Sequence, residues 1–318
     1  MKNVLIIGAA GQIGSELVAR LRQDEECSTV VAGYTGRTPL PESIRETGPC
    51  EIVDVTRGET IDEVVRKHKI DTIYNLAALL SAVGESRPLA AWNVGVNGIL
   101  NVLETARIHN CAVFTPSSIG VFGLETPHEK TPQDTVCRPR TMYGITKVTG
   151  ELLSDYYFHK YGVDTRSVRY PGLISHVTPP GGGTTDYAVE IFYSAVKNEE
   201  FVCPIAAGTF MDMAYMDDAI DGAIALMRAD PCKLVHRNAF NVTAMSFDPE
   251  MIARAIREVR PNFRMRYEVD PLRQSIAESW PDSMDDTAAR EEWGWNPKYD
   301  LNQMVQTMLA ELEKKLLL

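Results

Sequence analysis

Tyr143 and Lys147 are the two side chains whose types and spacing point most directly to chemistry. Residues four apart lie on one face of a helix, so a helix here presents a phenol and an ammonium to one small volume. A nearby cation favours the ionised form of a phenol, which can then take a proton from an alcohol. Ser118 follows a short apolar run, where its hydroxyl can orient the reacting oxygen. We expect these three residues to be catalytic.

A glycine pattern near the N-terminus predicts a dinucleotide site. The sequence Gly8-Ala-Ala-Gly11-Gln-Ile-Gly14 follows an apolar run and opens a helical pattern, which is the context that such a motif needs. Missing side chains permit a tight turn, and the N–H groups of the helix N-terminus attract a pyrophosphate. The expected cofactor contacts of this turn are Gly8, Gly11, Gln12, Ile13 and Gly14.

Three later segments complete the expected cofactor site and leave the choice of cofactor open. An acidic residue about 20 residues beyond the glycines normally binds the ribose of NAD, but Tyr34 stands there, and Arg37 nearby can attract the 2′-phosphate of NADP. Asp54 either accepts a hydrogen bond from adenine or caps a helix. Small residues after Asn75 let a cofactor lie across the sheet edge. The expected contacts are Tyr34, Arg37, Asp54, Val55, Leu76, Ala77 and Ala78, with Tyr143 and Lys147.

Strand and helix patterns alternate through the first half of the chain, which predicts a Rossmann-type doubly wound parallel sheet, an α/β fold. The expected strands include Asn3 to Ile7, Thr29 to Ala32, Thr72 to Leu76, Ala112 to Phe114 and Thr165 to Arg169. The expected helices are Ile13 to Leu21, Ile61 to His68, Trp92 to Ile108 and Thr141 to Tyr161. Long loops are expected at 34–49 and 123–140.

The composition changes after Pro171-Gly172, where a glycine-rich loop and more Pro and Trp begin. We therefore expect a dinucleotide-binding domain over residues 1–172, with 213–245 returning to it. A smaller C-terminal substrate-binding lobe would contain 173–212 and 246–318.

The charge and cysteine content bound the function. The 318 residues carry a net charge of -11, which argues against nucleic acid as a partner and favours a small molecule. The N-terminal apolar run is too short for a signal peptide or a membrane span. Six cysteines are scattered without a metal-ligand spacing, so we expect no metal site and a reducing, cytoplasmic location.

At these residues the chain resembles the extended short-chain dehydrogenase/reductase family, relatives of UDP-galactose 4-epimerase, over essentially its whole length. Within that family it is most similar to the short-chain-type L-threonine 3-dehydrogenases. Members usually carry Asp where Tyr34 stands and Asn where Gly95 stands. The segments that carry the closer resemblance are Arg138 to Gly144, Arg169 to Ser175, Pro180 to Ala188 and Asp270 to Pro281.

The resemblance implies oxidation of L-threonine to L-2-amino-3-oxobutyrate with NAD. Tyr143 would take the hydroxyl proton, Lys147 would hold the nicotinamide ribose, and Ser118 would orient the substrate. It also implies a homodimer that pairs through 92–108 and 141–161. The further cofactor contacts that it implies are Tyr170, Pro171 and Ile174, and the further substrate contacts are Ser81, Thr184, Thr185 and Trp280.

Two other functions fit the same machinery. A nucleotide-sugar 4-epimerase that retains NAD would need basic residues for a diphosphate, which Arg264, Arg266 and Arg273 can supply. A non-catalytic NAD(P)-sensing regulator has no need of the acid–base pair. A zinc-dependent mechanism is disfavoured, because the scattered Cys and His residues offer no plausible ligand set.

Overall fold

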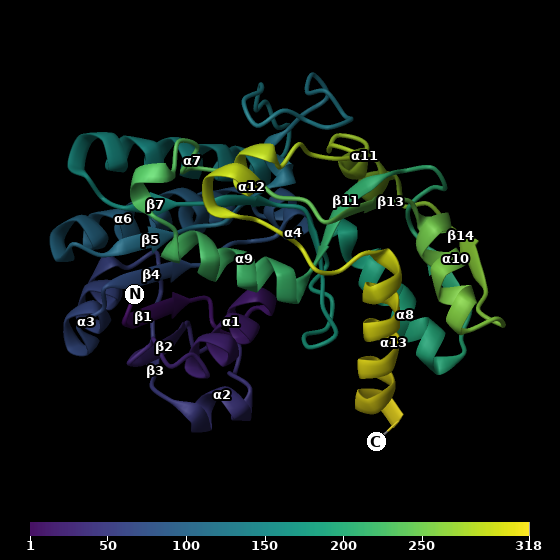
Figure 1. The fold of residues 1–318 in the computed structure, drawn as a ribbon, viewed down its shortest axis with the longest axis horizontal. Helices are drawn as coiled ribbons and strands as arrows, with labels where there is room; N and C mark the ends of the chain where they lie inside the picture. Colours follow the sequence, from purple (N-terminus) through teal and green to yellow (C-terminus); the bar gives the residue numbers. More distant parts are fainter. Residues whose placement is uncertain (318) are drawn as a thin grey trace.

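Six parallel strands form the central sheet of the computed structural model, which describes residues 1–317 (Figure 1). In spatial order they are β3 (Cys50–Ile52), β2 (Thr29–Tyr34), β1 (Asn3–Ile7), β4 (Thr72–Asn75), β5 (Ala112–Phe114) and β7 (Thr165–Arg166). The chain order reverses between β1 and β4, which is the point where such sheets bind nucleotides at their carboxyl edge. The predicted doubly wound α/β fold is confirmed.

Apolar side chains cover both faces of this sheet. Alternate residues of a strand point to opposite faces, and Val4 and Ile6 pack into one cluster while Leu5 and Ile7 pack into another. The first cluster includes side chains of α1 (Gln12–Arg22) and α9 (Met216–Arg228). The second includes side chains of α3 (Gly58–His68), α6 (Gly98–His109) and α7 (Met142–Tyr161). The continuous apolar runs of the sequence are therefore strands buried on both sides.

Two expected elements are interrupted, and a short helix lies in a segment that was expected to be a loop. The predicted helix 92–108 begins at the last residue of α5 (Pro88–Trp92), continues through the π-helical segment η1 (Asn93–Asn97) and covers nearly all of α6. The predicted strand 165–169 breaks at Ser167, whose N–H donates to the carbonyl of Arg237. Its second part, β8 (Val168–Tyr170), pairs with β6 (Ser117–Ser118) and β12 (Phe240–Asn241). The short helix α2 (Glu42–Thr47) lies in the segment expected to be a loop.

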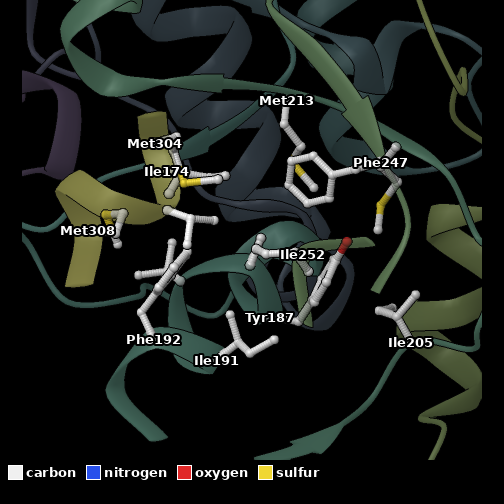
Figure 2. Close-up of a cluster of buried hydrophobic side chains, with 14 of the residues drawn as sticks. Ile174, Tyr187, Ile191, Phe192, Ile205, Met213, Phe247, Ile252, Met304 and Met308 are labelled. Atoms are coloured by element: carbon white, nitrogen blue, oxygen red, sulfur yellow. The ribbon is translucent and has the colours of Figure 1, made fainter. Parts of the chain in front are cut away.

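The second half of the chain builds a separate apolar core (Figure 2). It contains β9 (Gly172–Ile174), β11 (Met211–Tyr215) and β13 (Met245–Phe247) in one small sheet, and β10 (Phe201–Cys203) beside β14 (Met265–Tyr267) in another. Its helices are α8 (Tyr187–Lys197), α10 (Pro249–Val259), α11 (Pro271–Ala277) and α13 (Leu301–Leu317), while α12 (Thr287–Trp293) packs near the central sheet. The division of the chain into two lobes stays a prediction. None of the helices within 1–317 combines the length and apolar character needed to cross a membrane.

Glu16 links the first helix to the segment that leaves β9. Its carboxyl group accepts a hydrogen bond from the Ser175 hydroxyl. Beside it, the hydroxyl groups of Ser15 and Thr178 lie within hydrogen-bond distance of each other. Burial raises the pKa of Glu16 from 4.5 to about 7, although the Ser175 hydrogen bond opposes the rise. The folded protein therefore holds this proton more tightly than the unfolded chain does. The free energy of unfolding must fall as the pH rises through this range.

Glu16→Gln should remove that pH dependence, because an amide of the same shape does not ionise. Above pH 7 the variant should be more stable than the wild type by up to roughly 3 kcal/mol, and below pH 4.5 the gain should vanish. Urea unfolding at both pH values measures the difference. Glu26→Gln is the control, because the Glu26 side chain is 73% exposed. If the free energy of unfolding changes with pH equally in Glu16→Gln and the wild type, Glu16 is not the group that causes the pH dependence.

Candidate active site

A cleft of about 170 Å³ at the carboxyl edge of the central sheet gathers residues from widely separated segments. Its walls come from the first residues of α1, the segment after β4, the segments around β6 and after β8, the first turns of α7, and the loop before α8. The sequence-predicted residues that line it are Gln12, Ile13, Leu76, Ala78, Ser81, Ser118, Tyr143, Lys147, Tyr170, Pro171, Thr184, Thr185 and Trp280.

Tyr143 enters the cleft from the first turn of α7. Thr141 caps this helix, because its hydroxyl accepts a hydrogen bond from the N–H of Gly144 at 3.1 Å. A Cβ atom on Gly144 would lie 2.1 Å from the Gly120 carbonyl oxygen, so only glycine allows this close approach. The approach brings the Tyr143 ring within 3.1 Å of the position where a Cβ atom of Gly120 would lie.

Ser118 lies on the other side of the same small space. Its oxygen is 3.4 Å from that Gly120 Cβ position and accepts a hydrogen bond from the Gly120 N–H at 3.1 Å. The hydroxyl proton of Ser118 is therefore available to a ligand. The phenol ring of Tyr143 and the hydroxyl of Ser118 thus border the same small space beside Gly120.

Lys147 lies one helical turn beyond Tyr143. Its ammonium donates a hydrogen bond to the Pro116 carbonyl at 2.6 Å and is 5.6 Å from the centre of the Tyr143 ring. The contact with Pro116 ties α7 to the segment that carries Ser118. The cation thus lies beside the phenol ring.

The glycine turn has the shape that a dinucleotide requires. Gly8 adopts a φ of +88°, which favours glycine. A Cβ atom on Gly14 would lie 2.2 Å from the Gly8 carbonyl oxygen, so α1 starts directly against the turn. Gly11 provides no side chain to cap α1, which leaves the first N–H groups for an anion. Within the described residues, the buried side-chain nitrogen of Gln12 has no hydrogen-bond partner. These features fit NAD.

The remaining predicted cofactor residues lie outside this cleft. Tyr34 ends β2, and the largely exposed guanidinium of Arg37 is 3.9 Å from the Asp54 carboxylate. Hydrogen bonds from Thr56 hold the pKa of Asp54 below its usual range, although partial burial opposes them.

Three more of these residues also lie outside the cleft, and two of them are buried. Val55 is buried against Gly98, and Ala77 lines a smaller cavity behind Lys147. Ile174 is buried in the apolar core of Figure 2 rather than facing the cleft.

Asp186 is a cleft residue that the sequence analysis did not single out. Its carboxylate accepts hydrogen bonds from the N–H groups of Gly182 and Gly183, at 2.7 and 2.8 Å, and so fixes the glycine-rich loop. An Asp directly after a glycine-rich loop was the available signal. Thr184, which follows this loop, is buried, and its hydroxyl has no partner among the described residues.

Gly95, where the family resemblance leads us to expect Asn, packs against α7. A Cβ atom there would lie 2.8 Å from the Thr146 Cβ atom, so a larger side chain would push η1 away from α7. Over residues 1–317, no group of three or more His, Cys, Asp and Glu side chains has an arrangement that could hold a metal ion.

The chain is similar to known proteins over most of its length. The NAD dependent epimerase/dehydratase family model matches residues 4–242. An uncharacterized epimerase/dehydratase of Staphylococcus aureus (strain MRSA252) is 53% identical over 315 residues, which cover 99% of this chain and 98% of that protein.

Two solved structures are similar over almost the whole chain. The L-threonine dehydrogenase of Clostridium difficile has a TM-score of 0.96 and 54% identity, covering 99% of this chain and 98% of the other. The holo form of the GalE-like L-threonine dehydrogenase of Cupriavidus necator has a TM-score of 0.93 and 48% identity, covering 98% and 99%. The resemblance stated from the sequence is confirmed: the chain belongs to the NAD dependent epimerase/dehydratase family and is an NAD-dependent enzyme.

Proposed function

We propose that the protein oxidises L-threonine to L-2-amino-3-oxobutyrate, with NAD as the oxidant. The observation that carries this proposal is the convergence of the Tyr143 ring and the Ser118 hydroxyl on one small space beside the Lys147 ammonium. The L-threonine dehydrogenases of Clostridium difficile and Cupriavidus necator support the choice of substrate. Bound NAD supplies the acceptor for the hydride that leaves C3 of the substrate.

Tyr143 is the general base of this reaction, and two neighbours support it. The Ser118 hydroxyl donates a hydrogen bond to the substrate oxygen, because the Ser118 oxygen already accepts one from Gly120. This bond turns the substrate hydroxyl toward the phenolate of Tyr143, which takes its proton. The Lys147 ammonium, fixed by Pro116, stabilises the negative charge on the phenolate.

The loop before α8 supplies the substrate contacts. The buried, unpartnered hydroxyl of Thr184 would cost stability unless a ligand completes its hydrogen bonds, and an amino acid can do so. Thr185 and Ser81 add hydroxyl groups to the same wall, and the buried Trp280 closes it. These small polar groups suit a zwitterion better than a nucleotide sugar.

The test is an assay of the purified protein with L-threonine and NAD, followed by the absorbance of NADH. We expect NADH to form with L-threonine, and more slowly with NADP in place of NAD. Turnover of UDP-glucose without NADH would replace the proposal by the nucleotide-sugar epimerase. NAD binding without turnover of either substrate would favour the sensing regulator.

We also propose that two copies pair through α6 and α7. Ile145, Leu152 and Tyr156 are exposed and share one face of α7, because they recur at helical spacing. Ile108 of α6 and Leu89 of α5 are exposed as well. Apolar side chains gathered in this way indicate a protein interface.

Leu152→Glu should convert the dimer to a monomer, because the dimer would bury the added carboxylate without a partner. Light scattering after size-exclusion chromatography measures the mass. Leu272→Glu, at another exposed leucine on α11, is the control. A wild type that is monomeric at all concentrations, or a dimeric Leu152→Glu variant, would rule out this interface.

A further inference from the structure

A buried ion pair lies directly behind the catalytic side chains. Glu151 occupies the turn of α7 after Lys147, on the same face as Tyr143 and Lys147. Arg169 of β8 donates to both oxygens of its carboxylate, at 3.0 and 2.8 Å. Both side chains are less than a tenth exposed. Neither is among the residues to which the proposed function assigns a role.

This ion pair holds the segment that carries Ser118. The Ser117 hydroxyl donates a hydrogen bond to Glu151, and the neighbouring Pro116 carbonyl accepts one from Lys147. Lys147 and Glu151, on two successive turns of α7, therefore form hydrogen bonds with two successive residues of the other segment. Glu151, Ser117 and Lys147 also line one small buried cavity of about 20 Å³, so nothing bulky separates them.

Arg169 extends the link to the far side of β6. β8 pairs with β6 in parallel, with Arg169 opposite Ser117 and Tyr170 opposite Ser118. The Arg169 guanidinium also donates to the Gln133 carbonyl at 2.9 Å and to the side-chain oxygen of Asn241 at 3.1 Å. The pair of charges thus connects α7 with β8, and both of these elements contact the strand that carries Ser118.

We propose that Glu151 and Arg169 are positioning residues: the pair fixes Ser118 opposite Tyr143, and its balanced charges set the field in which Tyr143 ionises. The role of the pair in positioning Ser118 rests on the proposed function, whereas its effect on the ionisation of Tyr143 can be measured without any substrate. While both charges are present, their effects on the phenol largely cancel. Removing one charge leaves the other buried and uncompensated behind Lys147.

Neutralising Glu151 and neutralising Arg169 should therefore shift the titration of Tyr143 in opposite directions. Glu151 lies two turns from Tyr143, or about 12 Å along the helix axis. At that distance a single buried charge should shift a titration by roughly half to one pH unit. The other ionisable groups around this pair and the cleft stay unchanged in every variant. They are Lys147 and Asp155 on α7, Tyr170 on β8, Glu85 on α4 (Ser81–Ser86), Asp134 and Cys137 on the 123–140 loop, and Asp186 across the cleft.

The experiment compares Glu151→Gln with Arg169→Gln. We expect the acidic limb of the pH profile of kcat/KM to move to lower pH in Glu151→Gln and to higher pH in Arg169→Gln. The double variant, with two neutral amides, should return the limb to its wild-type position. If an unpaired buried charge prevents a single variant from folding, the double variant can still be measured, because no charge is then left unpaired, and a displaced limb in it would contradict the inference.

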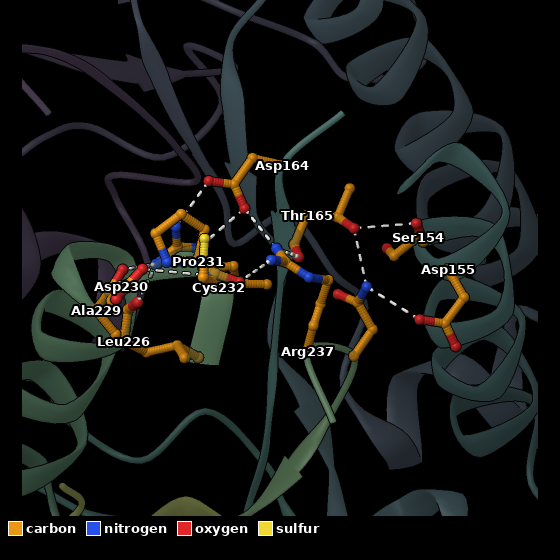
Figure 3. A network of polar contacts seen from close by, with 12 residues as sticks. Ser154, Asp155, Asp164, Thr165, Leu226, Ala229, Asp230, Pro231, Cys232 and Arg237 are labelled. Carbon is orange, nitrogen blue, oxygen red and sulfur yellow. Dashed lines mark hydrogen bonds and ion pairs between the residues drawn. The ribbon is translucent and has the colours of Figure 1, made fainter. Parts of the chain in front are cut away.

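Ser117→Ala tests the mechanical link separately, because it removes only the hydrogen bond to Glu151. We expect kcat to fall by roughly tenfold with the limb unmoved. Arg237→Gln is the matched control at another buried ion pair, between Arg237 and Asp164 (Figure 3). Asp164 keeps its bond to Arg166 in that variant, and Arg237 does not line the cleft.

A second readout needs neither substrate nor turnover. Carbon-13 NMR of ring-labelled tyrosines reports each phenol's ionisation directly, and Tyr143→Phe assigns the signal among the 12 tyrosines. Opposite displacements of the Tyr143 titration support the inference even if L-threonine is not the substrate. Shifts in the same direction, or no shift beyond that of Arg237→Gln, would overturn it.

Discussion

Tyr143→Phe should lower kcat/KM for L-threonine by roughly 10²- to 10⁴-fold, because the variant lacks the group that takes the substrate proton. The ring that packs against Gly120 stays, so the shape of the cleft should be kept. NADH should therefore bind nearly as it does to the wild type. Steady-state formation of NADH gives the first quantity, and fluorescence titration with NADH gives the second.

The same helix provides a matched control for this prediction. Tyr156 and Lys160 repeat the Tyr–Lys spacing of the catalytic pair, and the Lys160 ammonium donates to the Tyr156 hydroxyl at 2.5 Å. This hydrogen bond lowers the pKa of Tyr156. Tyr156 lies outside the cleft, on the face of α7 proposed to pair two copies, and Tyr156→Phe keeps the ring of that face, so the variant should keep full activity. Equal activities of the two variants would remove Tyr143 from its assigned role.

These two pairs show how far the sequence could identify the site. Spacing alone cannot separate Tyr143 from Tyr156, because both have a lysine four residues later. The glycine turn and Ser118 favoured the first pair, since they place a dinucleotide and a hydroxyl at the same sheet edge. The positioning roles of Glu151 and Arg169 were not predicted, because the contacts of Arg169 include Gln133 and Asn241, which are distant in the chain.

The fold was predictable where local patterns and burial agree. The runs from Asn3 and from Thr29 are apolar on both strand faces, and both form strands of the central sheet. The π-helical segment η1 at 93–97 and the break in the predicted strand at Ser167 depend on tertiary contacts instead. Gly95 leaves room for the Thr146 side chain of α7, and the N–H of Ser167 donates a hydrogen bond to the carbonyl of Arg237. Neither partner can be identified from the sequence pattern around the interruption.

Gly14→Ala should weaken NADH binding by roughly 10- to 100-fold, or 1–3 kcal/mol. The added methyl group would lie 2.2 Å from the Gly8 carbonyl oxygen and 2.9 Å from the Ala9 Cα atom. Both neighbours are backbone atoms, so no side chain can rotate away. The helix α1 must move from the turn, and its N–H groups then no longer meet the pyrophosphate.

Gly58→Ala separates this steric effect from the general cost of changing a glycine at the start of a helix. Gly58 begins α3, and its nearest neighbours would be atoms of the Asn101 side chain at 3.5 Å, an ordinary contact. Fluorescence titration with NADH should therefore give a wild-type affinity for Gly58→Ala. Thermal unfolding with and without NAD checks that Gly14→Ala is folded but is no longer stabilised by the cofactor. If Gly14→Ala binds NADH as tightly as Gly58→Ala does, the cofactor does not depend on the close approach of α1 to Gly8.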